Sequence, residues 1–340
     1  MVFSFDTGIL QYVLSFLPVT GFLVVLFWFD SFKLVSKSIL LLCLLWGIVS
    51  AVVSFYVNTA AFESLALTFN NYTRYFSPLV EEVMKSLVLV FLVSRKRIGF
   101  TVDAAIYGFA AGTGFALAEN MTYLMSHGNG HDQVVWLLRG FGTAIMHGGN
   151  TAVVAMLLMN GIQRNKPVYV AVWAGLLTAI MLHSAYNHFF LNPFLQTVFL
   201  LIVWPLVFIL VFQKSHFMLQ NWLEIEFSNE VQMLRMIRQG RMMQTRAGEY
   251  LASLRKYFGP EVIVDLYCYI SLYLELSIKA KRNLMLRENG FPVMEEPGTG
   301  EKLLELQHLR RQIGKAGELA LRPLVRMNYR ELWKLNLLKK

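Results

Sequence analysis

The stretch SPLVEEVMKSLVLVFLVS, residues 77–94, has the length and apolar content of a membrane helix, but it carries two glutamates and a lysine. A helix of about 20 residues crosses a hydrocarbon core that is about 30 Å thick. An ionisable side chain at that depth is costly, so Glu81, Glu82 and Lys85 are expected either to serve a function or to pair tightly. Glu81 and Lys85 are four residues apart and therefore lie on one helix face, and we expect Lys85 to keep one glutamate charged.

The composition of the whole chain agrees with a membrane location for this helix. Of 340 residues, 56% are hydrophobic and only 16% are charged, which excludes the ordinary soluble proteins. Apolar runs that are long enough to cross a bilayer recur along the chain, so the sequence predicts an all-α polytopic membrane protein with about seven transmembrane helices. The expected spans are residues 8–29, 38–58, 77–94, 102–126, 140–160, 168–190 and 194–213.

Basic residues in the short loops predict the orientation of these spans. They follow the first, third and fifth spans, at residues 33–37, 95–97 and 164–166. Short loops that are rich in lysine and arginine stay on the cytoplasmic side of a membrane. We therefore expect the N-terminus outside and the C-terminus in the cytoplasm.

The composition changes at the end of the last expected span, which divides the chain into two expected domains. Residues 1–213 form the transmembrane domain, and residues 214–340 hold 21 of the 31 lysines and arginines but 14 of the 22 aspartates and glutamates. Apolar residues at helical spacing predict a basic, helical, cytoplasmic domain in the second part. Its positive charge suits the anionic inner leaflet of the bilayer, and it could also bind a cytoplasmic partner.

Ionisable residues on four expected spans fall at one depth in the membrane. With the orientation above and about 1.5 Å of rise per residue, Glu81 and Glu82 lie roughly 6–8 Å below the outer surface. By the same measure Glu119, His147 and His183 lie roughly 10 Å deep. The sequence therefore predicts one polar site, placed towards the outer face, to which each of these helices contributes.

Carboxylates and imidazoles that converge in a dry pocket can hydrolyse an unreactive bond. A glutamate can take a proton from water, and histidine or asparagine donors can stabilise the oxyanion that forms at a scissile carbonyl. The same groups could instead hold one divalent metal ion that activates the water. No GxSxG or HExxH motif is present, which disfavours a serine or zincin mechanism. A purely structural cluster of ion pairs is the alternative.

Four short motifs carry a resemblance to a known family. Glu81-Glu82-Val-Met-Lys85 resembles EExxK, and Phe115-Ala-Leu-Ala-Glu119-Asn120 resembles FxxxEN. His147 and His183-Ser-Ala-Tyr-Asn187 look like the third and fourth motifs of the PrsW family of intramembrane proteases. The resemblance covers about residues 75–190. This family, whose members are described as glutamic-type or metallo-type, is similar to the group of CaaX prenyl endopeptidases and Abi proteins, in which the second motif ends in histidine.

The resemblance implies a regulatory membrane endopeptidase of a bacterial cell membrane. Such an enzyme makes the first, extracytoplasmic cut in a membrane-anchored protein such as an anti-sigma factor. The roles carried over from the motifs are a water-activating base at Glu81 or Glu82 with help from Glu119, oxyanion or metal binding by His147, His183 and Asn187, and supporting contacts from Lys85, Phe115 and Asn120. A single divalent ion, such as zinc, would be held by His147, His183 and Glu119.

Two functions from other classes fit the sequence less well. Polar residues at one depth also describe an ion-coupled transporter, but the chain shows no inverted repeat. A membrane scaffold whose basic tail recruits a partner is the other alternative. The string PGTGEK, residues 297–302, lacks both the preceding strand and the Lys-Ser/Thr pair of a phosphate loop, and no nucleic-acid partner is expected.

Overall fold

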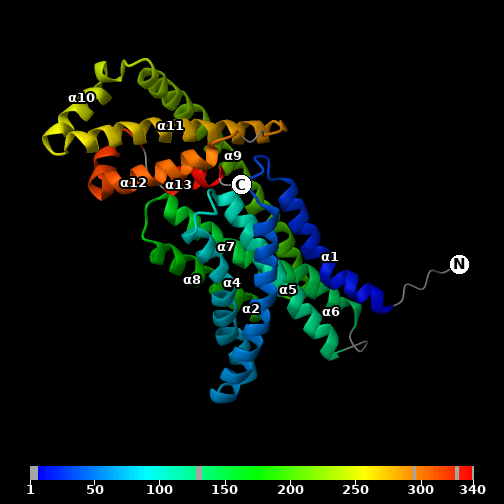
Figure 1. Ribbon diagram of the computed structural model, residues 1–340. Coiled ribbons are helices and arrows are strands. Elements are labelled where there is room, and N and C mark those ends of the chain that lie inside the picture. Colours follow the sequence, from blue (N-terminus) through cyan, green and yellow to red (C-terminus); the bar gives the residue numbers. More distant parts are fainter. Residues whose placement is uncertain (1–6, 128–131, 294–295, 326–328, 339–340) are drawn as a thin grey trace. The chain divides into compact units, whose positions relative to one another are not determined.

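The computed structural model describes residues 7–127, 132–293, 296–325 and 329–338 (Figure 1). Every regular element within these residues is a helix, as the apolar periodicity predicts. In chain order the elements are α1 Thr7–Trp28, α2 Lys37–Ser64, α3 Phe69–Asn71, η1 Tyr72–Phe76, α4 Ser77–Ser94, α5 Thr101–His127, α6 Gln133–Leu137, η3 Leu138–Thr143, α7 Ala144–Gln163, α8 Val168–Asn187, α9 Pro193–Arg238, η4 Met242–Gln244, α10 Arg246–Ser253, η5 Leu254–Lys256, α11 Pro260–Glu288, α12 Thr299–Leu321 and α13 Tyr329–Asn336.

The chain divides into two compact units. The N-terminal unit is Met1–Ser215 and the C-terminal unit is His216–Lys340. The long helix α9 contributes residues to both.

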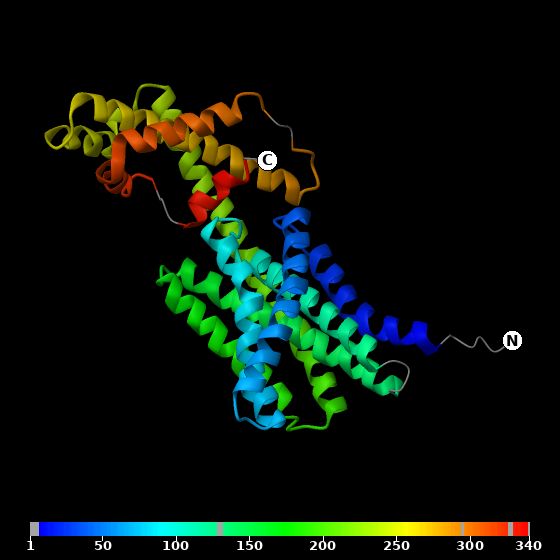
Figure 2. The same ribbon diagram turned by 60° about the horizontal axis from the view of Figure 1, so that its bottom comes forward.

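Helix α5 is the centre of the N-terminal unit and packs against α7 and α2 (Figure 1, and Figure 2 from a second side). It can approach both neighbours because glycines face them. A Cβ at Gly112 would lie 2.2 Å from the carbonyl oxygen of His147 on α7, and a Cβ at Gly114 would lie 2.0 Å from the carbonyl oxygen of Leu44 on α2. These close approaches bring α5, which carries the second motif, and α7, which carries His147, into direct contact.

Two π-helical segments lie immediately before motif helices. η1 leads into α4, which carries the EExxK motif, and η3 leads into α7, which carries His147. A π-turn inserts an extra residue into the helical repeat and so rotates the side chains that follow it. Such turns occur frequently at functional sites, and both of these adjoin motif residues.

Within the described residues, five helices are long and apolar enough to cross a membrane, whereas the sequence predicted about seven spans. The five segments are Gly8–Trp28, Lys37–Ser64, Gln133–Gln163, Val168–Asn187 and Pro193–Arg238. The two expected spans outside this set are α4, which holds three charged residues, and α5, which is rich in glycine and alanine. The charged residues of α4 and the small residues of α5 lower the apolar content of these two helices. That α4 and α5 span the membrane therefore stays a prediction.

The C-terminal unit has its own apolar core. Residues from α9 to α13 build it, among them Leu234, Leu251, Leu266, Tyr269, Ile270, Leu303 and Leu321, which are all less than one tenth exposed. The periodicity of residues 214–340 predicted these helices, and burial of one face of each against the others stabilises the unit.

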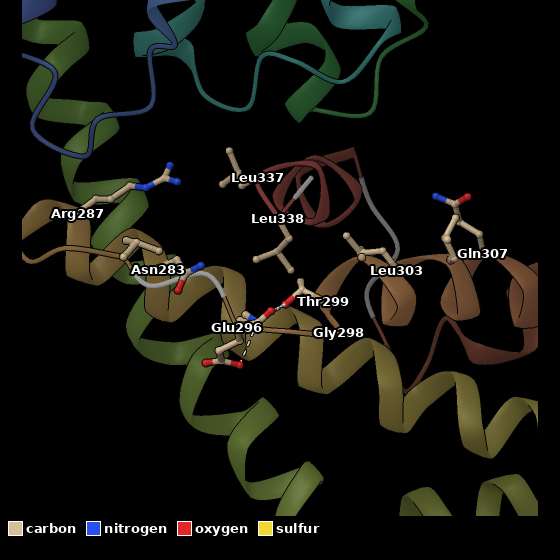
Figure 3. Close-up of a pocket in the computed structure, with 13 residues that line it drawn as sticks. Asn283, Arg287, Glu296, Gly298, Thr299, Leu303, Gln307, Leu337 and Leu338 are labelled. Carbon is tan, nitrogen blue, oxygen red and sulfur yellow. Dashed lines mark hydrogen bonds and ion pairs between the residues drawn. The ribbon is translucent and has the colours of Figure 1, made fainter. Parts of the chain in front are cut away.

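A cavity of about 760 Å³ in the C-terminal unit lies where α12 begins (Figure 3). Lys279, which lines it, pairs with Glu296 at 3.0 Å. The lysine of the PGTGEK string, Lys302, pairs with Glu275 on α11. Gly298 of that string allows the turn into α12, since its φ is 79° where the helix starts.

Candidate active site

Glu82 on α4 is the most enclosed carboxylate of the site. Its side chain is fully buried, and Oε1 accepts hydrogen bonds from Lys85 Nζ at 2.7 Å and from His183 Nδ1 at 2.8 Å. Oε2 has no hydrogen-bond partner among the described residues. Lys85 therefore pairs with Glu82, three residues before it, and not with Glu81, four residues before it. This arrangement compensates a buried negative charge and fixes the ring of His183.

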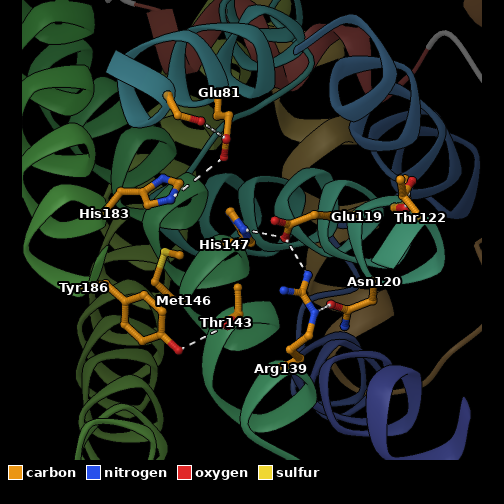
Figure 4. Close-up of polar contacts among 12 residues, drawn as sticks. Glu81, Glu119, Asn120, Thr122, Arg139, Thr143, Met146, His147, His183 and Tyr186 are labelled. Atoms are coloured by element: carbon orange, nitrogen blue, oxygen red, sulfur yellow. Dashed lines mark hydrogen bonds and ion pairs between the residues drawn. The ribbon is translucent and has the colours of Figure 1, made fainter. Parts of the chain in front are cut away.

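Glu81, the neighbouring residue, is placed differently. Its side chain is 14% exposed and lines a cavity of about 610 Å³. Oε1 accepts a hydrogen bond from Ser77 Oγ at 2.6 Å, and Ser77 Oγ accepts one from Asn58 Nδ2 at 3.0 Å. Oε2 lies 3.9 Å from His183 Nε2, and Figure 4 shows the two side chains turned towards each other. Glu81 is therefore the member of the pair that a molecule in the cavity can reach.

His147 on α7 links the EExxK motif to the second motif. Its Nδ1 lies 3.0 Å from Lys85 Nζ and its Nε2 lies 3.1 Å from Glu119 Oε2. An ammonium group can only donate, so Nδ1 accepts and the ring proton on Nε2 faces Glu119. The ring of Phe115 lies beside the His147 ring and beneath Lys85 Nζ, at 4.9 and 4.6 Å. Phe115 thus packs against this hydrogen-bonded chain, and its supporting role stays a prediction.

Arg139 is a site residue that the sequence analysis missed. Its Nη2 lies 3.4 Å from Glu119 Oε2, and its Nε donates to Asn120 Oδ1 at 3.0 Å (Figure 4). Its guanidinium also stacks 4.1 Å from the centre of the Tyr123 ring. The expected fifth span began at residue 140 and left Arg139 in an outer loop. The helical run in fact covers Gln133–Gln163, so the only available signal was a basic residue next to that span.

Asn120 and Asn187, two of the predicted site residues, each donate a hydrogen bond to a main-chain oxygen. Asn120 donates from Nδ2 to the main-chain oxygen of Ser15 at 2.9 Å, which ties the second motif to α1. Asn187 donates from Nδ2 to the main-chain oxygen of Thr73 at 2.9 Å, which ties α8 to η1. Asn187 thus has a structural contact outside the chain of ion pairs, and its role towards an oxyanion or a metal stays a prediction.

Three of the predicted residues can offer ligand atoms to one metal ion. One atom from each of Glu81, His147 and His183 lies within 4.8 Å of the others. Two imidazoles and a carboxylate are a donor set typical of catalytic zinc, and Glu82 orients His183 as an outer carboxylate orients a zinc-bound histidine. The residues therefore fit a divalent ion. The carboxylate that lies close to both histidines is Glu81, whereas the sequence predicted Glu119. To bind the ion, His147 would have to give up its contact with either Lys85 or Glu119.

The cavity connects the two accessible carboxylates. Glu81, Glu119 and Arg139 all line it, together with residues of α2 and η1. The larger cavity of the C-terminal unit is lined by none of the motif residues. The cavity therefore brings a bound molecule to two carboxylates, with His147 at 3.1 Å from Glu119 and His183 at 3.9 Å from Glu81.

Comparisons with known proteins give the family. The family model described as PrsW family intramembrane metalloprotease matches residues 35–212, which is slightly more than half of the chain. Searches of curated proteins and of solved structures gave no match. The matched segment contains every motif residue and the whole of the site described above. The chain is therefore a membrane peptidase that belongs to the PrsW family of intramembrane metalloproteases.

Proposed function

We propose that Glu81 activates the water molecule that attacks the scissile peptide bond of a membrane-anchored protein. One observation carries this assignment: Glu81 lines the cavity, whereas Glu82 is buried between Lys85 and His183. A general base must come within hydrogen-bond reach of the proton that it removes. Glu82 meets a different need, because it holds His183 and balances the charge of Lys85.

The remaining residues of the site have complementary tasks. Glu119 also lines the cavity as a carboxylate that Arg139 and His147 hold in place, and it can receive the proton that Glu81 takes from the water and pass it to the leaving amine. The ring N–H of His147 can stabilise the oxyanion after a small rotation away from Glu119, while His183, held at Nδ1 by Glu82, turns Nε2 towards Glu81. Lys85 contacts both Glu82 on α4 and His147 on α7, and so holds these two side chains in fixed positions relative to each other.

A divalent ion fits the same site. Glu81, His147 and His183 would hold it, and it would polarise the scissile carbonyl and lower the pKa of a bound water. With these three residues so engaged, Glu119 is the cavity carboxylate left to accept the proton of the attacking water, and Arg139 then keeps it ionised and in position.

The substrate is a single-pass protein that is cut near the extracytoplasmic side, in a regulatory role such as the first cleavage of an anti-sigma factor. The family supports this proposal, and so do the loop charges, from which we expect the N-terminus outside and the C-terminus in the cytoplasm of a bacterial cell membrane. With α4 and α5 counted as spans, the site lies in the outer half of the membrane. The basic C-terminal unit is free in this scheme to dock on the inner leaflet or on a cytoplasmic partner.

The test compares new N-termini of membrane proteins in cells that express the wild type, Glu81→Gln, Glu82→Gln or the control Glu305→Gln, which changes an exposed residue of α12. Specific outer-side cuts are expected with the wild type and with Glu305→Gln. Glu81→Gln is expected to abolish them, because the amide cannot accept the proton. Equal cut profiles for wild type and an abundant, folded Glu81→Gln protein would refute the proposal and favour a transporter or scaffold.

A further inference from the structure

The 610 Å³ cavity has two elongated walls that run past the catalytic carboxylates. Its lining runs from Ala51 to Glu63 on α2 and from Phe115 to Ser126 on α5. Helical rise makes these two walls about 16–18 Å long. An extended peptide advances about 3.3 Å per residue, so the walls match a segment of about five residues. Ser36, just before α2, donates to Tyr107 Oη, and a Cβ at Gly47 would meet Ala111 and Phe115, so α2 and α5 run side by side in the same direction.

The walls are rich in aromatic side chains. Those that line the cavity are Phe55, Tyr56, Phe62, Phe69, Tyr72, Phe115 and Tyr123. Phe55 and Tyr56 are 57% and 68% exposed, so much of their ring surface is open to a bound molecule or to lipid. Three of the four charged lining residues, Glu81, Glu119 and Arg139, already have partners within the site, and the fourth, Glu63, is the last lining residue of α2. The cavity therefore offers apolar surface beside its carboxylates, and large apolar side chains fit such a surface best.

The hydroxyl group of Ser54 is a polar group of the cavity that forms no hydrogen bond with the described residues. Ser54 is 1% exposed and lines the cavity. Other hydroxyls of the same helix behave differently, because Ser50 and Thr59 donate to carbonyl oxygens of their own helix. A buried hydroxyl without a partner is costly, and a bound peptide carries main-chain groups that would satisfy it.

We infer that this cavity binds an extended segment of the substrate next to the scissile bond, that it selects a large apolar residue there, and that Ser54 hydrogen-bonds the substrate main chain. The inference rests on the proposed function, because it identifies the occupant of the cavity as the chain that Glu81 and Glu119 cut. The exposed rings of Phe55 and Tyr56 give this segment a way in from the lipid side of α2. Substrate choice then depends on α2 and α5, and the chemistry depends on α4, α5, α7 and α8.

The experiment uses the full-length protein in phosphatidylcholine and phosphatidylglycerol vesicles with synthetic single-pass peptides. The peptides share one apolar span and differ at one position of a short outer segment, which is Phe, Leu, Ala or Asp. Mass spectrometry measures the cleavage rates. The wild type is expected to cut the Phe and Leu peptides at least about tenfold faster than the Ala and Asp peptides.

Variants of the walls separate the cavity from the chemistry. Ala118→Phe on α5 and Ala51→Phe on α2 fill the cavity, and each is expected to remove the advantage of the large residues. Met121→Phe is the matched control, because Met121 is exposed on α5 and does not line the cavity. Ser54→Ala is expected to slow all four peptides alike by about tenfold. Unchanged preference in both filled variants, with wild-type cleavage intact, would overturn the inference while the peptidase assignment stood.

A second readout does not depend on turnover. The same peptides carry a photo-reactive benzoylphenylalanine in the outer segment and are irradiated with the Glu81→Gln protein. Cross-links to residues 51–63 and 115–126 are expected, and Ala118→Phe is expected to reduce them. Cross-links confined to other helices would overturn the inference. If the wild type cuts none of the peptides, the proposed function fails on these substrates, and the cross-links alone decide the occupant of the cavity.

Discussion

Arg139 holds two side chains of the site at once. Its forked guanidinium reaches Glu119 with Nη2 and Asn120 with Nε, and its flat face rests on Tyr123. A lysine could supply the charge for the ion pair with Glu119 but not the simultaneous hydrogen bond to Asn120 and the stacking on Tyr123. Arg139 is therefore a positioning residue that sets where the Glu119 carboxylate sits in the cavity.

Replacement of Arg139 tests this role. Arg139→Gln is expected to lower kcat about 100-fold with little change in KM, because a displaced Glu119 transfers its proton poorly. Arg139→Lys is expected to restore part of this loss through its charge. The rates are measured with one peptide substrate in vesicles, and Arg95→Gln, at an exposed position after α4, serves as the control. Equal losses for the lysine and glutamine variants of folded protein would argue against a role for the charge.

The contact of α5 with α7 depends on the missing side chain of Gly112. A Cβ there would meet the carbonyl oxygen of His147 at 2.2 Å and its carbonyl carbon at 2.6 Å, and both are main-chain atoms that cannot rotate away. The two helices would have to separate. Because Glu119 lies on α5 and His147 on α7, separation would lengthen their 3.1 Å contact.

Gly112→Ala is therefore expected to lower both stability and activity. Overpacking of this kind costs about 1–3 kcal/mol of unfolding free energy. Gly21→Ala is the control, because no described atom lies within 4 Å of a Cβ at Gly21 on α1. That variant is expected to keep wild-type cleavage. Thermal unfolding in detergent and the cleavage rate check both variants, and equal behaviour of the two proteins would contradict the importance of this contact.

The C-terminal unit contains a buried network of charges of its own. Glu331 on α13 accepts hydrogen bonds from Trp222 Nε1 at 2.9 Å and Tyr273 Oη at 3.0 Å, and it pairs with Lys334. Burial by itself raises the pKa of Glu331, but the charges of Lys334 and Lys281, with hydrogen bonds from Lys334 and Trp222, outweigh it and hold the pKa at about 2. The ordinary value is 4.5.

This pKa predicts how the stability of the protein depends on pH. A folded pKa below the unfolded one means that Glu331 contributes stability that is fully present above about pH 4.5 and is lost as the pH falls towards 2. The contribution is on the order of 3 kcal/mol. Melting temperatures of the wild type and Glu331→Gln should therefore differ at pH 7 and converge as the pH falls through this window. Glu305→Gln, at an exposed position on α12, should show no such convergence, and a constant difference for Glu331→Gln would contradict the prediction.

The sequence by itself determined the helical class, the family and the set of helices that bring Glu81, Glu82, Glu119, His147 and His183 to one site. These features depend on local properties. Long apolar runs must form helices in a bilayer, because no water satisfies their main-chain groups, and residue spacing fixes which face of a helix each side chain occupies.

Tertiary structure decided which atoms meet. Spacing allowed Lys85 to pair with either glutamate, and the approach of His147 and His183 selected Glu82. Arg139 entered the site because η3 extends the helix before α7, and Asn187 turned to Thr73 because η1 lies beside α8. Such pairings depend on the rotation and distance of helices that are remote in sequence. Glycine contacts and π-turns set that rotation and distance, and only the folded chain shows them.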